Sequence, residues 1–263
     1  MILMGESLSA DRTRRQRDEP AGHGTGSTAQ GRCSLDRENR MCFSPTASFV
    51  ATGVLGSIGV ATWRHVREPR TVLFASVPML FAFHQFCEGM VWLGLEGRIG
   101  PLALNHFAFL FTLYAQGLLP TLMPAAVALM EPRGWRRNAI VGLTVVGAVA
   151  SAWDAYGLIF VPSRVFVDHF SVAYRNPLTG NLWISLLYIL ATCGALLLSS
   201  HRVIRTYGVV NVIALTIVQI VRSYAFASVW CFYAAIMSVM IYWQFRRNTI
   251  RIGTPAKNAA LAS

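Results

Sequence analysis

Seven apolar stretches, separated by polar loops, dominate the pattern of residues along this chain. They are Ala47–Trp63, Thr71–Leu95, Asn105–Met130, Ala139–Val161, Leu182–Ser200, Tyr207–Val221 and Tyr224–Phe245. About 20 apolar residues are needed for a helix to cross the hydrocarbon core of a bilayer. Most of the stretches reach that length, so the pattern predicts an all-α membrane protein, a bundle of seven transmembrane helices in contact with the lipid bilayer.

Composition supports a single membrane domain. Hydrophobic residues make up 54% of the 263 residues and charged residues only 13%, whereas soluble domains carry about 25% charged residues. We expect a disordered polar tail over residues 1–45, the transmembrane domain over 46–247 and a short cytoplasmic tail over 248–263. Because the first 40 residues carry seven arginines and little apolar periodicity, Met41 is predicted to be the natural start.

Arginine alternates between the loops. The loops after the first, third and fifth stretches, and the exit after the seventh, each carry two or three arginines, and the other loops carry fewer. Positive residues gather on the cytoplasmic side, so we expect an outside N-terminus and a cytoplasmic C-terminus in a bacterial cytoplasmic membrane. The same placement accounts for the net charge of +11, and nucleic acid is not an expected partner.

No catalytic signature is present. The five cysteines contain no C-x-x-C pair, which disfavours a disulfide framework or a zinc finger. We find no Walker A motif, no Rossmann glycine pattern and no G-x-S-x-G elbow. The seventh stretch has no lysine for a retinal Schiff base, which excludes a rhodopsin.

Two short motifs carry a family resemblance. The chain reads Met-Cys-Phe-Ser from Met41, followed by Thr-Ala-Ser-Phe, and the second stretch contains His-Gln-x-x-Glu-Gly from His84 to Gly89. From residue 41 to about 247, the chain resembles an uncharacterised family of bacterial multi-pass membrane proteins common in actinobacteria. The resemblance implies the same fold class and no established activity.

Ionisable side chains inside a membrane are costly and mark candidate sites. His84 and Glu88 are four residues apart and share one helix face. With the predicted orientation, most of the intramembrane polar residues lie in the outer half of the bilayer. They suggest a polar pocket open to the outside, whose candidate ligand-binding residues are His84, Glu88, Asp154, Gln219 and Arg222.

Three interpretations of these residues remain open. In the first they hold zinc, which accepts histidine and carboxylate ligands and polarises bound water. The candidate zinc ligands are His84, Glu88, His106 and Asp154, with Asp168 and His169 of the outer loop as further ligands or a lid. A zinc-dependent hydrolase acting on a lipid or an amide is the enzyme alternative that follows.

The second interpretation is structural, with Arg222 neutralising Glu88 or Asp154, because unpaired charges are unfavourable within a bundle. The third is a site that binds or transports a small molecule or an ion. We prefer binding among the active alternatives, because H-x-x-x-E is not the H-E-x-x-H motif of zinc hydrolases.

Glycines and prolines within the stretches predict how the helices pack. Small residues let transmembrane helices approach closely. We expect close helix contacts at Gly53, Gly56, Gly59 and Gly147. Prolines interrupt helical hydrogen bonding, and we expect kinks at Pro78, Pro120 and Pro124.

Overall fold

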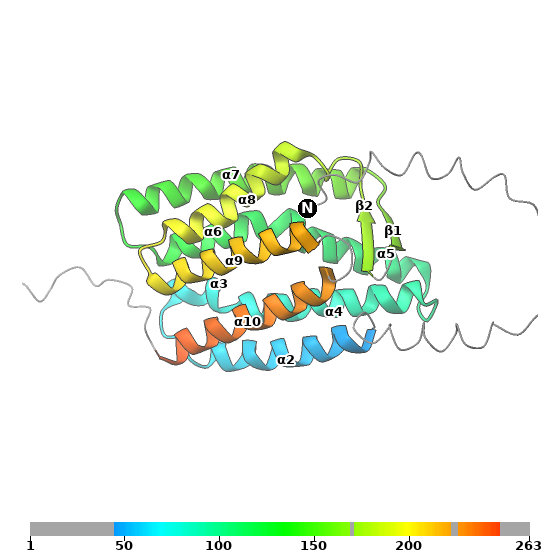
Figure 1. Cartoon of the computed structure of the whole chain (residues 1–263), viewed down its shortest axis with the longest axis horizontal. Coiled ribbons are helices and arrows are strands. Elements are labelled where there is room, and N and C mark those ends of the chain that lie inside the picture. Colours follow the sequence, from blue (N-terminus) through cyan, green and yellow to red (C-terminus); the bar gives the residue numbers. More distant parts are fainter. Residues whose placement is uncertain (1–44, 169–170, 222–225, 248–263) are drawn as a thin grey trace, which may run out of the picture.

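The computed structural model describes residues 45–168, 171–221 and 226–247, and each of the seven apolar stretches falls on a helix. The helical elements are α2 (Pro45–Trp63), η1 (Pro69–Thr71), α3 (Val72–Ala75), α4 (Val77–Leu95), α5 (Pro101–Thr112), η2 (Leu113–Leu118), α6 (Leu119–Met130), α7 (Trp135–Phe160), α8 (Leu182–Leu198), α9 (Arg202–Val221) and α10 (Phe226–Arg246). They run side by side along the long axis of the molecule (Figure 1). The fold is therefore an all-α bundle.

The helices of the bundle pack in two groups, one at each side, and further helix contacts connect the groups. Helix α2 packs against α4 and α10 at one side, and α7 packs against α6 and α8 at the other (Figure 1). Helices α4 and α5 contact each other, as do α8 and α9. Elements far apart in the sequence thus enclose a common interior.

Within the described part of the chain, four helical units are long and apolar enough to cross a membrane. They are Pro45–Trp63, Pro69–Leu95, Pro101–Met130 and Trp135–Phe160. Helix α8 is apolar but shorter, at 17 residues. These helices indicate a membrane protein.

Helix α7 has an exposed apolar face on the outside of the bundle and a buried face toward the interior. Val141, Val145 and Val149 are four residues apart, lie on one face of the helix and are all exposed. The opposite face is buried and carries Gly147 and Asp154. An apolar outer face over a partly polar interior is the arrangement that lipid favours.

Two of the three prolines lie where one helical segment gives way to the next. Ser76 separates α3 from α4, and Pro78 lies in the first turn of α4. Pro120 lies in the first turn of α6, directly after η2, and Pro124 lies inside α6. Proline is tolerated in a first helical turn because its missing N–H would have no partner there.

Among the described glycines, Gly147 makes the closest helix contact. A Cβ at this position would overlap the carbonyl oxygen of Pro120 and would lie 3.2 Å from the Cβ of Ala191. The prediction of a close contact is confirmed here, at the junction of α6, α7 and α8.

The three glycines of α2 differ from one another. A Cβ at Gly59 would lie 3.0 Å from the backbone nitrogen of Met79, so this contact is confirmed. A Cβ at Gly56 would make ordinary contact with Ala82 at 3.9 Å, and one at Gly53 would meet no atom within 4 Å. The prediction for Gly53 is wrong, because this face of α2 points away from the bundle.

The segment between α7 and α8, which the sequence suggested was a plain loop, contains a β-hairpin. Strands β1 (Arg164–Asp168) and β2 (Ser171–Arg175) pair antiparallel, with Phe166 opposite Ala173. Figure 1 shows the hairpin lying across one end of the bundle, beside α5.

Asn176 attaches the exit of this hairpin to the end of α7. Its Nδ2 donates to the carbonyl oxygens of Gly157 at 2.9 Å and Val161 at 3.0 Å, and its Oδ1 accepts from the Leu178 amide at 2.9 Å. Carbonyls at the end of a helix have few helical partners, and the Gly157 carbonyl accepts from the Val161 amide as well as from Asn176. One side chain therefore caps α7 and fixes the hairpin on it.

Replacing Asn176 by alanine is expected to loosen the hairpin. Losing these bonds should lower the unfolding free energy by about 1–3 kcal/mol and speed proteolysis between residues 162 and 181. Asn176→Asp keeps the acceptor for Leu178 but loses the donors, so its effect should be similar or slightly smaller. Limited proteolysis and thermal unfolding in detergent measure both effects. An Asn176→Ala protein that behaves like the exposed-site control Asn138→Ala would contradict the capping role.

Candidate functional site

His84 and Glu88 are buried side by side on α4. Their exposed fractions are 2% and 8%. The His84 ring stacks on Phe111 of α5, with centroids 3.9 Å apart and planes at 15°, and lies 5.0 Å from the ring of Tyr114 in η2. His84 Nδ1 has no hydrogen-bond partner among the described residues. The pair predicted from i, i+4 spacing thus faces the interior.

Tyr174 brings the hairpin to the same place. Its ring stacks on Phe111, with centroids 4.8 Å apart and planes at 17°, so Tyr174, Phe111 and His84 form a column of rings. The Tyr174 hydroxyl is buried and unpartnered within the described structure. Burial above all, and then the nearby Glu88 and Cys87, raise the pKa of this hydroxyl well above its ordinary value. It therefore keeps its proton at neutral pH.

Asp154 occupies a second position, at the junction of α7, α8 and η2. It is only 4% exposed, and its Oδ1 has no described hydrogen-bond partner. Tyr188 of α8 interacts with it electrostatically and donates a hydrogen bond of 3.1 Å to the Ala115 carbonyl of η2. One turn away, Ser151 accepts a 2.8 Å hydrogen bond from Thr121.

Tyr114 links the two positions. It contacts His84 on one side and lies near Tyr188 on the other. Its hydroxyl is buried without a described partner. We call this set of residues the interior polar cluster: His84, Glu88, Tyr114, Asp154, Tyr174 and Tyr188.

The three tyrosines of the cluster were not among the predicted site residues. Tyrosine in transmembrane helices favours the membrane interfaces, so Tyr114 and Tyr188 within apolar stretches were a usable signal. Tyr174 could not be recognised in this way, because its role depends on the hairpin folding over the bundle end.

The segment η2 is a π-helix in the middle of the long unit formed by α5, η2 and α6. Such segments are rare and are frequent at functional sites. Besides Tyr114, η2 contributes Gln116, whose Oε1 is buried without a described partner. The π-helix η2 therefore contributes two polar side chains with buried oxygens, Tyr114 and Gln116, to the interior of the bundle.

The candidate zinc ligands within the described part of the chain do not form one group. The described residues contain no group of three or more histidine, cysteine, aspartate or glutamate side chains that could hold a metal ion. His106 is exposed on α5, whereas His84, Glu88 and Asp154 are buried. Helices α4 and α7 bring His84 and Asp154 to different parts of the cluster, and a zinc hydrolase stays a hypothesis.

Several other candidates lie outside what the structure describes. Arg222 and His169 fall outside the described residues, as do the side chains of Gln219 and Asp168. Neutralisation of Glu88 or Asp154 by Arg222 therefore stays a prediction. Within the described residues, the one ion pair is the exposed pair of Arg98 and Glu96, at 3.5 Å.

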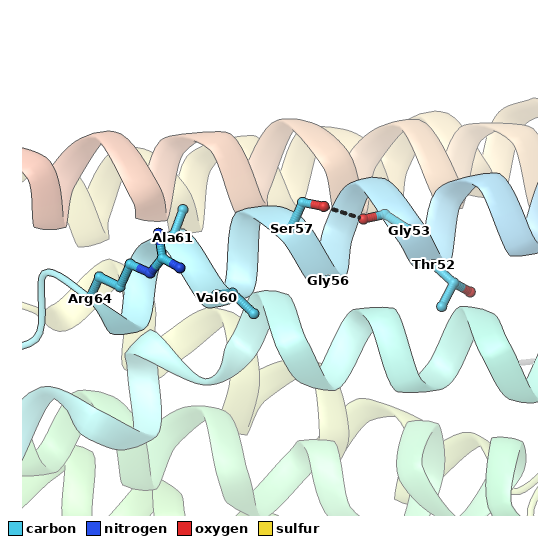
Figure 2. A pocket seen from close by; sticks show the side chains of 7 residues that line it. All are labelled: Thr52, Gly53, Gly56, Ser57, Val60, Ala61 and Arg64. Atoms are coloured by element: carbon cyan, nitrogen blue, oxygen red, sulfur yellow. Dashed lines mark hydrogen bonds between the residues drawn. The ribbon is translucent and has the colours of Figure 1, made fainter.

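A groove of about 470 Å³ lies apart from the cluster, on the outer face of α2 (Figure 2). It is lined by Thr52, Gly53, Gly56, Ser57, Val60, Ala61 and Arg64. All of these residues come from one helix and its end, and the Ser57 hydroxyl is already bonded to the Gly53 carbonyl at 2.8 Å. Nothing in this groove matches the convergent polar groups of the interior.

The fold indicates a helical membrane protein with a few polar groups buried in its apolar interior. The chain belongs to a family of unknown function (DUF6629), whose model matches residues 41–256. The match begins at Met41, the predicted natural start. No match to the chain was found among curated proteins or among solved structures.

Proposed function

We propose that this chain is a seven-helix protein of the bacterial cytoplasmic membrane that binds, or carries across, a small polar molecule or an ion at the interior polar cluster. One observation carries the proposal: buried polar atoms without a described partner gather in the cluster and beside it. These atoms are His84 Nδ1, Tyr114 OH, Gln116 Oε1, Asp154 Oδ1 and Tyr174 OH.

The energetics favour an occupant. A buried polar group without a partner costs about 1–3 kcal/mol, and native proteins leave few such groups. Elements α4, η2, α7 and β2 each contribute at least one of them. Ordered water or a polar ligand between these elements would supply the missing hydrogen bonds. A purely structural cluster would be expected to satisfy its own groups.

The distribution of arginine supports the proposed orientation. Of the thirteen described arginines, ten lie at the end of the bundle where α2, α6, α8 and α10 finish (Figure 1). They are Arg64, Arg67, Arg70, Arg133, Arg136, Arg137, Arg202, Arg205, Arg246 and Arg247. By the positive-inside rule this end is cytoplasmic. The hairpin, Glu88 and Asp154 then lie toward the outside, where a solute would enter.

A ligand screen with two matched glutamate variants tests the function. Purified protein in detergent is heated in the presence of inorganic ions, small amines, carboxylates and sugars. We expect at least one of these solutes to raise the melting temperature, and we expect Glu88→Gln to lose most of that shift. Glu96→Gln, which changes an exposed carboxylate at the end of the same helix, should keep it.

Two results would argue against binding at the cluster. One is a panel in which no solute shifts the melting temperature beyond its effect on a micelle-solubilised control protein. The other is a shift that Glu88→Gln and Glu96→Gln retain equally, which would place the ligand elsewhere.

A further inference from the structure

The two buried carboxylates differ in what surrounds them, and this difference deepens the proposed function, on which the inference rests. We propose that Asp154 holds a small monovalent cation, of the size of Na⁺ or K⁺, at the junction of α7, α8 and η2.

Glu88 has possible donors close by. Gln85, one turn earlier on α4, and the Tyr174 hydroxyl, which carries a proton, both lie near its carboxylate. A carboxylate with donors around it can remain in a buried site without a bound ion. Glu88 therefore has donor groups of its own in its surroundings.

Asp154 lacks such partners. Its Oδ1 is buried, and no described donor reaches it. Nor does any described arginine form an ion pair with it. An isolated ionised carboxylate inside a bundle is strongly unfavourable, so the group either takes up a proton or has its charge balanced by a cation. Of the two carboxyl groups, Asp154 is the one without described donors.

The described neighbour of Asp154 is an oxygen group, the hydroxyl of Tyr188. The Tyr188 hydroxyl uses its proton on the Ala115 carbonyl, which leaves its own lone pairs free to accept. Gln116, next to Ala115 in η2, has a buried Oε1 without a described partner. Carboxylate, amide and hydroxyl oxygens suit hard cations, whereas zinc and copper favour nitrogen and sulfur.

The charge of the site selects a monovalent ion. One carboxylate with neutral oxygens exactly balances a single positive charge. A divalent cation would leave a net positive charge in a low-dielectric interior, which is costly.

Cation-dependent stability tests the inference. Thermal unfolding is measured in NaCl, in KCl and in choline chloride at one fixed ionic strength. Na⁺ or K⁺ at about a hundred times its Kd should raise the melting temperature of the wild-type chain by roughly 5–10 °C relative to choline. Asp154→Asn, which preserves shape but removes the charge, should abolish that rise, and Glu96→Gln should preserve it.

Direct binding provides a second readout that does not depend on melting behaviour. Equilibrium binding of radioactive sodium should approach one ion per wild-type chain and fall at least tenfold in Asp154→Asn. Asp154→Glu, which keeps the charge but moves it, should bind more weakly than the wild type and more tightly than Asp154→Asn.

The results that would overturn the cation are distinct from those that would overturn the proposed function. If the melting temperature is the same in all three salts, cation binding at Asp154 is refuted. A ligand that shifts the melting temperature and depends on Glu88 would still support the proposed binding function. A salt effect of the same size in Asp154→Asn and in the wild type would also refute cation binding at Asp154. A sodium effect that appears only after Arg222→Gln would show that Arg222 is the natural counter-charge, which likewise overturns the proposal.

Discussion

Gly147→Ala should strongly destabilise the bundle, with the unfolding free energy falling by about 3 kcal/mol or more. The reason is local and steric. The added methyl group would overlap the carbonyl oxygen of Pro120 and crowd Ala191. A backbone carbonyl cannot rotate away as a flexible side chain can, so α6 and α7 would have to separate. That separation would also disturb the bond between Thr121 and Ser151, one turn away.

The matched control is Gly142→Ala, five residues earlier on the same helix. A Cβ at Gly142 meets no atom within 4 Å, and alanine favours helix by about 1 kcal/mol over glycine. This variant should therefore be as stable as the wild type or slightly more stable. Circular dichroism melts in detergent and yields of folded protein compare the two. Equal melting temperatures for both variants would refute the contact at Gly147.

The positions of the helices could be predicted because apolar length and arginine placement are properties of each segment alone. The predicted stretch Leu182–Ser200 became α8, ending at Leu198. The sixth stretch was underestimated, because α9 begins at Arg202 and uses Arg205 and Thr206 as helical residues. A charged first turn is compatible with a helix whose end reaches the membrane surface.

The site could be predicted only in part. His84 and Glu88 share a helix face by their spacing, which is a local property, and both are buried as expected. Whether Asp154 or His106 joins them depends on how α4, α5 and α7 rotate against one another. The stacking of Tyr174 on Phe111 depends further on a hairpin that has no strong sequence signal. Convergence of ligands from separate helices was therefore beyond the sequence.

Glu131 supports the second large prediction, at the arginine-rich end of the bundle. It follows the last residue of α6 and is 4% exposed. Its carboxylate accepts from the Ser199 hydroxyl at 2.9 Å and from the Ser200 amide at 3.0 and 3.2 Å. These donors lie just before α9, whose N-terminus carries a partial positive charge. One carboxylate thus joins the end of α6 to the turn between α8 and α9.

Glu131→Ala should lower the unfolding free energy by about 2–4 kcal/mol, because hydrogen bonds to a charged group are stronger than neutral ones and their donors would be left without partners. Glu131→Gln should fall between alanine and the wild type, since an amide oxygen can accept one of these bonds while its NH₂ group would meet another donor. Glu68→Ala, an exposed carboxylate at the same end of the bundle, is the control and should change stability by less than about 0.5 kcal/mol. Thermal melts in detergent rank the variants.

If Glu131→Ala and Glu68→Ala have the same melting temperature, the Glu131 carboxylate does not stabilise the turn before α9. The predicted order would instead show that the arginine-rich end of the bundle is fixed by a buried carboxylate with its hydrogen bonds satisfied, in contrast to Asp154, whose Oδ1 has no described partner.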